Sequence, residues 1–116
     1  IPSPEEGASA ILNEEIWRQI LTSLVICLFA RGIYDEKIVK EALSVVGLNM
    51  DTTLLKQKGL DILRMKYEFK IREGFDPKIL RIPKRITEVE TPLGKIDENY
   101  LRSLINEYFS KLYSIQ

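Results

Sequence analysis

Histidine is absent from this sequence of 116 residues, and cysteine occurs once, as Cys27. The missing histidine removes the commonest general base and the commonest metal ligand of proteins. A single cysteine cannot form a disulfide within its own chain. These two absences exclude catalysis by a Ser-His or a Cys-His pair, so the chain has no catalytic residue that we would name.

The sequence also lacks an apolar run long enough to cross a bilayer. Its most apolar stretch, residues 20–30, includes Thr22 and Ser23 and is far shorter than the roughly 20 residues that a spanning helix needs. The chain opens with Ile1, and no basic segment leads into an apolar stretch and a small-residue cleavage site. We therefore expect a processed or cut start, no targeting peptide, no membrane contact and a cytoplasmic location.

Charge of neither sign is in excess, because 17 Lys and Arg balance 17 Asp and Glu. The charges are nevertheless segregated: residues 56–85 hold 10 basic and 4 acidic side chains, against 4 and 8 in residues 1–55. With 45% hydrophobic and 29% charged residues, the composition is that of a globular protein and not of a disordered chain. At this length we expect one core and one domain over residues 1–116.

The first helix is predicted for residues 13–31, after a frayed leader at residues 1–10. Asn13 is a suitable cap for its start, and Gly32 is placed to stop it. Its apolar positions recur with the helical period and reach around most of the circumference. Such a helix is expected to be covered on most sides, and this prediction places Cys27 within it.

Two further helices follow at short spacing. Asp35 is a good cap for the second, which should run to about residue 46 and stop at Gly47. The third should begin at residue 51 or 52 and reach residue 71. Gly59 in its interior costs about 1 kcal/mol relative to alanine, so we expect another backbone to pack closely against it.

Proline and glycine recur between residues 73 and 94, which predicts an irregular segment with one short helix after Pro77. Asp97 then caps a last helix that continues to the chain end. No clear strand alternation is found. The predicted fold is all-α: a single irregular helical domain of about four main helices, with the Pro- and Gly-containing segment before the last one.

Two motifs stand out in this helical frame. The first reads Thr22-Ser23-Leu24-Val25-Ile26-Cys27-Leu28-Phe29, and the second, at residues 69–75, reads Phe69-Lys70-Ile71-Arg72-Glu73-Gly74-Phe75. They resemble Asp-Ser-Leu-x-x-Cys-x-Phe and Phe-Asn-x-Arg-Glu-Gly-Phe in the C-terminal domain of the tungsten-containing aldehyde ferredoxin oxidoreductases. The resemblance extends over residues 12–113.

By this resemblance, Cys27 is the fourth thiolate of a 4Fe-4S cluster whose other three ligands come from an earlier domain. Ile26 matches a position whose backbone faces the pterin of the tungsten cofactor. Thr22 stands where the family has an acidic residue that contacts the pterin, and a hydroxyl cannot replace that anion. The departure puts pterin contact at residue 22 in question.

The resemblance implies a function for the parent enzyme rather than for this chain alone. That enzyme would oxidise aldehydes to carboxylic acids at a tungstopterin and pass electrons through the cluster to ferredoxin. The implied partners are the N-terminal domains or a separate subunit of the enzyme, and ferredoxin. One thiolate cannot hold a cluster, so the isolated chain should bind no cofactor, be inactive and self-associate through exposed apolar surface.

Two alternative functions remain beside this one, and the motif at residues 72–75 has two interpretations of its own. The chain could be a helical interaction module that kept the fold without the redox role, as Thr22 suggests. The second and third helices also have the outline of a helix-turn-helix, but zero net charge argues against nucleic-acid binding. For the motif at residues 72–75, a structural helix-ending turn is favoured over a substrate clamp.

Overall fold

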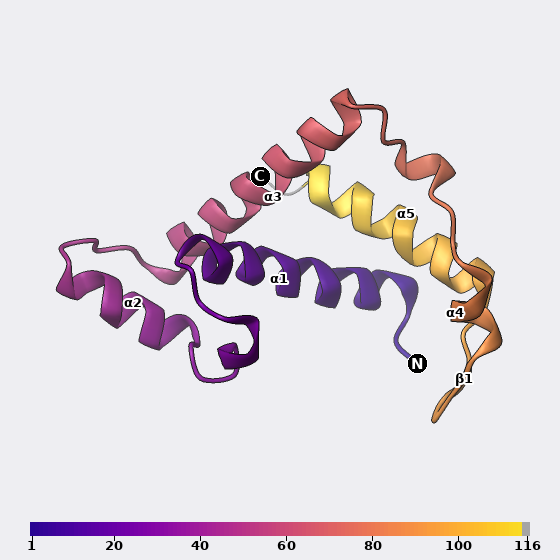
Figure 1. The fold of residues 1–116 in the computed structure, drawn as a ribbon, viewed down its shortest axis with the longest axis horizontal. Helices are drawn as coiled ribbons and strands as arrows, with labels where there is room; N and C mark the ends of the chain where they lie inside the picture. The colour runs from indigo at the N-terminus through magenta and orange to yellow at the C-terminus, as the bar shows by residue number, and fades with distance from the viewer. Residues whose placement is uncertain (115–116) are drawn as a thin grey trace. The chain divides into compact units, whose positions relative to one another are not determined.

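The computed structural model describes residues 1–114, and within them the fold is mostly helical (Figure 1). Four long helices, one short helix and two 3-10 turns account for most of this part of the chain. The prediction of an all-α fold with about four main helices is therefore confirmed. In chain order the elements are α1 (Pro4–Ser23), η1 (Leu28–Ala30), α2 (Glu36–Val45), α3 (Thr52–Arg72), η2 (Pro77–Ile79), α4 (Lys84–Glu88), β1 (Glu90–Thr91), β2 (Gly94–Lys95) and α5 (Glu98–Ser114).

Contacts divide the chain into two compact units. One unit combines Ile1–Asn13 with the chain from Glu68 onward, and the other is the continuous stretch Glu14–Tyr67. Helices α1 and α3 contribute residues to both units, since the two boundaries fall inside them. The expectation of one domain over residues 1–116 stays a prediction.

The start of α1 differs from the sequence-based prediction, because residues 4–10 are helical and not a frayed leader. Ser3 and Glu6 form a capping box: the Glu6 N–H donates to the Ser3 hydroxyl at 3.2 Å, and the Ser3 N–H donates to the Glu6 carboxylate at 3.0 Å. Pro4 fits the first helical position, where no N–H is needed. These contacts satisfy donors that would otherwise be open to water.

The end of α1 also differs, because the helix stops at Ser23 and does not continue to residue 31. The Ile26 N–H donates to the Leu21 carbonyl at 2.9 Å and the Val25 N–H to the Thr22 carbonyl at 3.0 Å, which is the Schellman arrangement. Val25 takes the left-handed position of that motif at φ 59°. Glycine usually occupies this position, so nothing in the sequence signalled the stop.

The core of the unit formed by Glu14–Tyr67 lies between α1, α2 and α3. Its buried cluster is joined by four partly buried side chains, of which Trp17 and Ile26 come from the first part of the chain. The buried members are Ile20, Leu21, Val39 and Leu55, and the remaining partly buried ones are Leu43 and Met50. Ile26 is thus anchored in this core although it lies beyond the end of α1.

Helices α2 and α3 begin where the sequence predicted. Asp35 caps α2 by accepting from the Ile38 N–H at 2.9 Å, and Asp51 accepts from the Leu54 N–H at 2.7 Å at the start of α3. Gly47 follows α2 at φ 85°, as expected for a helix stop. The predicted boundaries of both helices are confirmed to within a residue or two.

Gly59 of α3 is packed against the backbone of α1, as predicted. A Cβ atom built on Gly59 would lie 2.5 Å from the Ile16 carbonyl oxygen and 2.9 Å from Ile16 Cγ2. Both residues are buried. The glycine therefore permits an approach of the two helices that any side chain would prevent.

In the other unit, α5 packs beside the first turns of α1. The Tyr100 hydroxyl donates to the Pro2 carbonyl at 2.8 Å, and Lys111 pairs with Glu5 at 3.5 Å. A Cβ atom on Gly7 would lie 2.9 Å from Leu104 Cδ1, so the two helices are in close contact there. Asp97 caps α5, as predicted, by accepting from the Tyr100 N–H at 3.0 Å.

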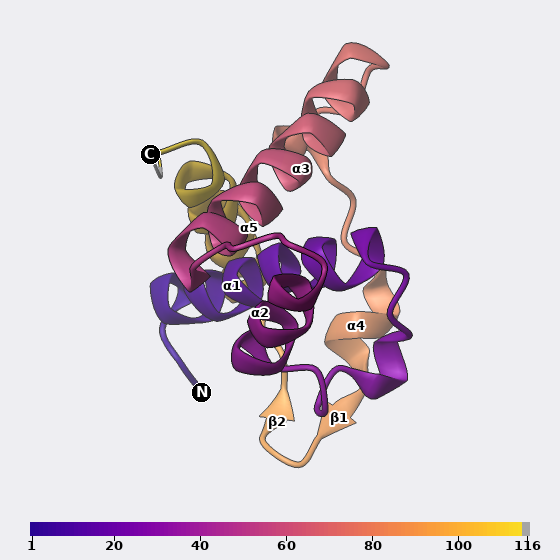
Figure 2. The ribbon, with the colours of Figure 1, turned by 90° about the vertical axis from the view of Figure 1, so that its left-hand side faces the viewer.

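The segment between α3 and α5 holds more structure than the sequence indicated. The predicted short helix after Pro77 is present as η2, capped by Asp76. The helix α4 follows, and then the antiparallel hairpin of β1 and β2, in which Glu90 pairs with Lys95 and Thr91 with Gly94 (Figure 2). Strands of two residues are too short to show alternation, so the hairpin was not predicted.

Candidate functional site

Cys27 is exposed and free, and it lies in the connection after α1 rather than inside a helix. Its backbone is extended, at φ −61° and ψ 134°, and it precedes the first residue of η1. The Cys27 carbonyl accepts from the Ala30 N–H at 2.9 Å, which fixes the turn that follows. The predicted position within a buried helix is therefore wrong, but the sulfur does lie at the surface of its unit.

The surface around Cys27 along the chain is unusually apolar. Val25 is 92% exposed, Phe29 94% and Ile33 66%. Leu24, Leu28 and Tyr34 are exposed to a smaller extent. Exposed apolar residues that follow one another in this way are typical of surfaces that other protein or ligand groups cover.

The two other candidate residues precede Cys27, one at the end of α1 and one in the connection itself. Thr22 belongs to the last turn of α1 and its side chain is exposed. Ile26 buries part of its side chain in the core, and its N–H is taken by the Leu21 carbonyl. Of the backbone polar groups of Ile26, only the carbonyl can serve a ligand without breaking the helix-ending hydrogen bond.

Among residues 1–114, no group of three or more His, Cys, Asp or Glu side chains is arranged to hold a metal ion. An iron-sulfur cluster of this type is held by four thiolates. The chain therefore fits such a cluster as the donor of one exposed thiolate, and the other ligands have to come from elsewhere.

The last four residues of the second motif, residues 72–75, form the end of α3 and the turn that follows it. The Phe75 N–H donates to the Lys70 carbonyl at 2.9 Å and the Gly74 N–H to the Ile71 carbonyl at 3.0 Å, with Gly74 at φ 101°. The Phe75 ring lies against Phe109 of α5, with 6.2 Å between centroids. The interpretation of this motif as a structural helix-ending turn is confirmed.

The basic side chains of α3 are mostly engaged with their neighbours. Lys56 pairs with Glu36 at 3.0 Å, Lys66 donates to Gln19, and the Arg72 guanidinium lies 5.6 Å from the centre of the Phe69 ring. Lys66 satisfies the amide oxygen of the buried Gln19 across two helices. These contacts give the basic residues local roles in holding the helices.

A charged hollow that the sequence did not indicate lies in the unit Glu14–Tyr67. Its volume is about 610 Å³, and Trp17 and Arg31 line it together with the first turn of α2. Its two carboxylates are both engaged, because Asp35 caps α2 and Glu36 pairs with Lys56. The lining residues are scattered along the chain, so only the folded structure brings them together.

The comparison with protein families tests the resemblance that the two motifs indicated. The family model described as "Aldehyde ferredoxin oxidoreductase, domains 2 & 3" matches residues 2–115. The chain belongs to the aldehyde ferredoxin oxidoreductase family. Neither the curated proteins nor the solved structures gave a match.

The family match covers nearly the entire chain, and the description of the family model names domains 2 and 3 of the oxidoreductase. It agrees with the resemblance drawn from the motifs at Cys27 and at residues 72–75. Among the described helices, none combines the length and the apolar character that crossing a membrane requires.

Proposed function

We propose that this chain is the C-terminal part of an aldehyde ferredoxin oxidoreductase-like enzyme and that Cys27 supplies one thiolate to its 4Fe-4S cluster. The observation that carries the proposal is the exposure of the only cysteine, in a chain that matches the family over residues 2–115. When bound, tungstopterin would oxidise an aldehyde to a carboxylic acid, and the cluster would carry electrons to ferredoxin.

The role of Cys27 in this proposal is to present its sulfur at a fixed point. The Schellman turn at the end of α1 and the 3-10 turn after the cysteine hold the connecting backbone on both sides. The apolar side chains of Val25 and Phe29 would be covered by the domain that brings the other ligands. Covering them would keep water from the cluster and so help to set its potential.

Thr22 and Ile26 would form part of the wall toward the pterin. The Thr22 hydroxyl can donate or accept one hydrogen bond, and the Ile26 carbonyl can accept one from a pterin N–H. Neither group can supply the negative charge of the family's acidic residue. We therefore propose that these residues position the pterin by contact and single hydrogen bonds rather than by ion pairing.

The proposed partners are the N-terminal domains or subunit of the same enzyme, and ferredoxin as electron acceptor, in the cytoplasm. A 4Fe-4S cluster takes four thiolates and this chain has one, so binding the cluster requires a partner. The alternative function is a helical interaction module without redox chemistry. The exposed, uncharged Thr22 at the pterin position favours that alternative.

Anaerobic reconstitution tests the proposal. The chain is mixed with the N-terminal portion of a family enzyme, iron and sulfide, and the visible absorption of the cluster is recorded. We expect a 4Fe-4S spectrum with the natural chain and a weakened or altered one with Cys27→Ser, because one thiolate is then missing. Leu28→Ser, which alters the neighbouring surface but keeps the thiol, should leave the spectrum unchanged.

A cluster spectrum that is the same with Cys27→Ser as with the natural chain would overturn the ligand role. If the two portions bind each other tightly and form the same cluster with either sequence, the interaction module becomes the better account.

A further inference from the structure

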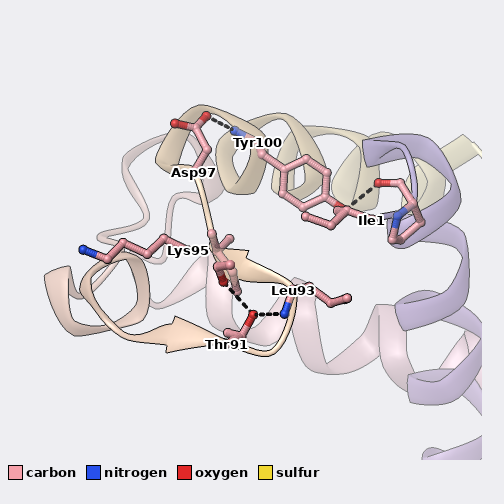
Figure 3. A pocket seen from close by; sticks show the side chains of 9 residues that line it. Ile1, Thr91, Leu93, Lys95, Asp97 and Tyr100 are labelled. Carbon is pink, nitrogen blue, oxygen red and sulfur yellow. Dashed lines mark hydrogen bonds between the residues drawn. The ribbon is translucent and has the colours of Figure 1, made fainter.

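An apolar pocket with a volume of about 420 Å³ lies in the unit that contains α5 (Figure 3). Its walls come from three places: the start of the chain, the β1–β2 hairpin and the first turn of α5. They include Ile1, Pro2, Thr91, Leu93, Ile96 and Tyr100. The volume falls within the range of small-molecule pockets, about 300–1,000 Å³.

The polar groups at this pocket are already used by the protein. The Thr91 hydroxyl donates to the Gly94 carbonyl at 2.6 Å and accepts from the Leu93 N–H at 3.2 Å. The Tyr100 hydroxyl donates to the Pro2 carbonyl at 2.8 Å. Figure 3 shows these hydrogen bonds closing the hairpin turn and joining the start of the chain to α5. A ligand would therefore find apolar surface, not open donors and acceptors.

The exception is the α-ammonium of Ile1, which belongs to the lining together with Asp97 and Lys95. The Asp97 carboxylate accepts from the Tyr100 N–H at the cap of α5, and the Lys95 side chain extends away from Ile1 and Tyr100 in Figure 3. A cationic ligand that entered the pocket would lose water and meet the like charge of the Ile1 ammonium, which is unfavourable.

We propose that this pocket binds a small, uncharged, mainly apolar molecule. Shape and the burial of apolar surface would supply the affinity, with the Tyr100 ring and the Leu93 side chain as opposite parts of the wall. The proposal does not depend on the role of Cys27, which lies in the other unit.

A titration of the isotope-labelled 116-residue chain with benzyl alcohol, followed by the backbone amide NMR signals, tests the proposal. We expect saturable shifts concentrated in residues 93–100. Benzylamine places a positive charge on a similar ring, and we expect it to bind at least about tenfold more weakly because its charge must be desolvated beside the Ile1 ammonium.

Leu93→Ser removes apolar wall, and the substitution should not unfold the hairpin because Leu93 is 74% exposed. We expect it to weaken benzyl alcohol binding by about fivefold. Ile79→Ser is the matched control, since Ile79 is 76% exposed and does not line the pocket. The affinity of the Ile79→Ser variant for benzyl alcohol should equal that of the natural chain.

Absence of saturable shifts, shifts centred elsewhere, or equal binding of benzylamine would overturn the proposal. Shifts of residues 93–100 that follow protein concentration without any probe would also overturn it, because a second copy of the chain would then be the occupant.

Discussion

Gly59 is the residue at which one added methyl group has the clearest predicted effect. Alanine would gain about 1 kcal/mol in helix propensity, but its Cβ would lie 2.5 Å from the Ile16 carbonyl oxygen. That atom belongs to the backbone of α1 and cannot move aside as a flexible side chain could. We expect Gly59→Ala to lower the free energy of unfolding by about 1–3 kcal/mol, as measured by denaturant titration.

Gly32 is the control for this substitution. A Cβ atom there would meet no heavy atom within 4 Å. We expect Gly32→Ala to leave the stability unchanged or slightly higher. Equal effects at the two glycines would show that helix packing at Gly59 is looser than the structure indicates.

Val25 is a second residue whose backbone determines the outcome of substitution. A β-branched residue at φ 59° is strained, and its side chain is 92% exposed, so little packing is lost when it is removed. We expect Val25→Gly to raise the free energy of unfolding by about 1 kcal/mol, because glycine fits the left-handed position.

The same change in a regular helix should have the opposite sign. Val45 is the last residue of α2 and is 85% exposed. Val45→Gly should therefore lower the stability by roughly 0.5 kcal/mol through helix propensity alone. If thermal melts show that Val25→Gly also destabilises the chain, the left-handed conformation of Val25 is not a source of strain.

At the scale of elements, the capping box of α1 makes its first turn sensitive to pH. Hydrogen bonds from the backbone N–H and the side chain of Ser3 hold the pKa of Glu6 below its ordinary value of 4.5. Because the pKa is lowered by folding, the ionised carboxylate stabilises the turn above pH 4.5, and this contribution is lost as the pH falls through the folded-state pKa.

We expect Glu6→Gln to abolish this pH dependence, because glutamine keeps a hydrogen-bond acceptor but has no charge to lose. The Cα chemical shifts of residues 4–8 should report loss of helix on acidification in the natural chain and little change in the variant. Identical titration curves for the two proteins would contradict the capping-box account.

Helix boundaries with strong local sequence signals were predicted correctly, whereas both ends of α1 were not. Asp35 with Gly47, and Asp97 before α5, marked boundaries that the structure confirms. At the start of α1 the signal was present, since Ser3 and Glu6 have capping-box spacing, but the prolines and glutamates suggested a disordered leader. At the end of α1 no signal existed, because Val25 occupies a position where glycine is usual.

At the scale of the whole molecule, exposed apolar surface near Cys27 predicts self-association of the isolated chain. Val25 and Phe29 are more than nine-tenths exposed, and apolar surface of this kind promotes association. We expect a dimer or larger assembly by light scattering at tens of micromolar protein, with a reductant present to exclude disulfide formation.

Phe29→Ser should lower the measured mass toward that of a monomer, since it removes the most exposed aromatic ring of the apolar surface near Cys27. Met65→Ser on α3, at a position that is 66% exposed, serves as the control and should leave the mass unchanged. If light scattering shows that the natural chain is a monomer, the connection after α1 is not a surface for self-association.

The residues of the candidate site were proposed from the sequence, and they stay a prediction, whereas their geometry could not be predicted. The motifs around Cys27 and at residues 69–75 indicated the family that the comparison then confirmed. These motifs could not show that the helix ends four residues before the cysteine or that the Ile26 N–H is already bonded to Leu21. The hollow beside Trp17 and the pocket beside Tyr100 could not be predicted, because their walls are assembled from distant segments.

The most direct test of the central claim is the alkylation of Cys27, followed by mass spectrometry under anaerobic conditions. In the isolated chain the exposed thiol should react readily with iodoacetamide. After assembly with the cluster-bearing N-terminal portion it should be protected, and removal of iron by a chelator should restore its reactivity. Equal alkylation with and without the cluster would contradict the claim that Cys27 is a ligand.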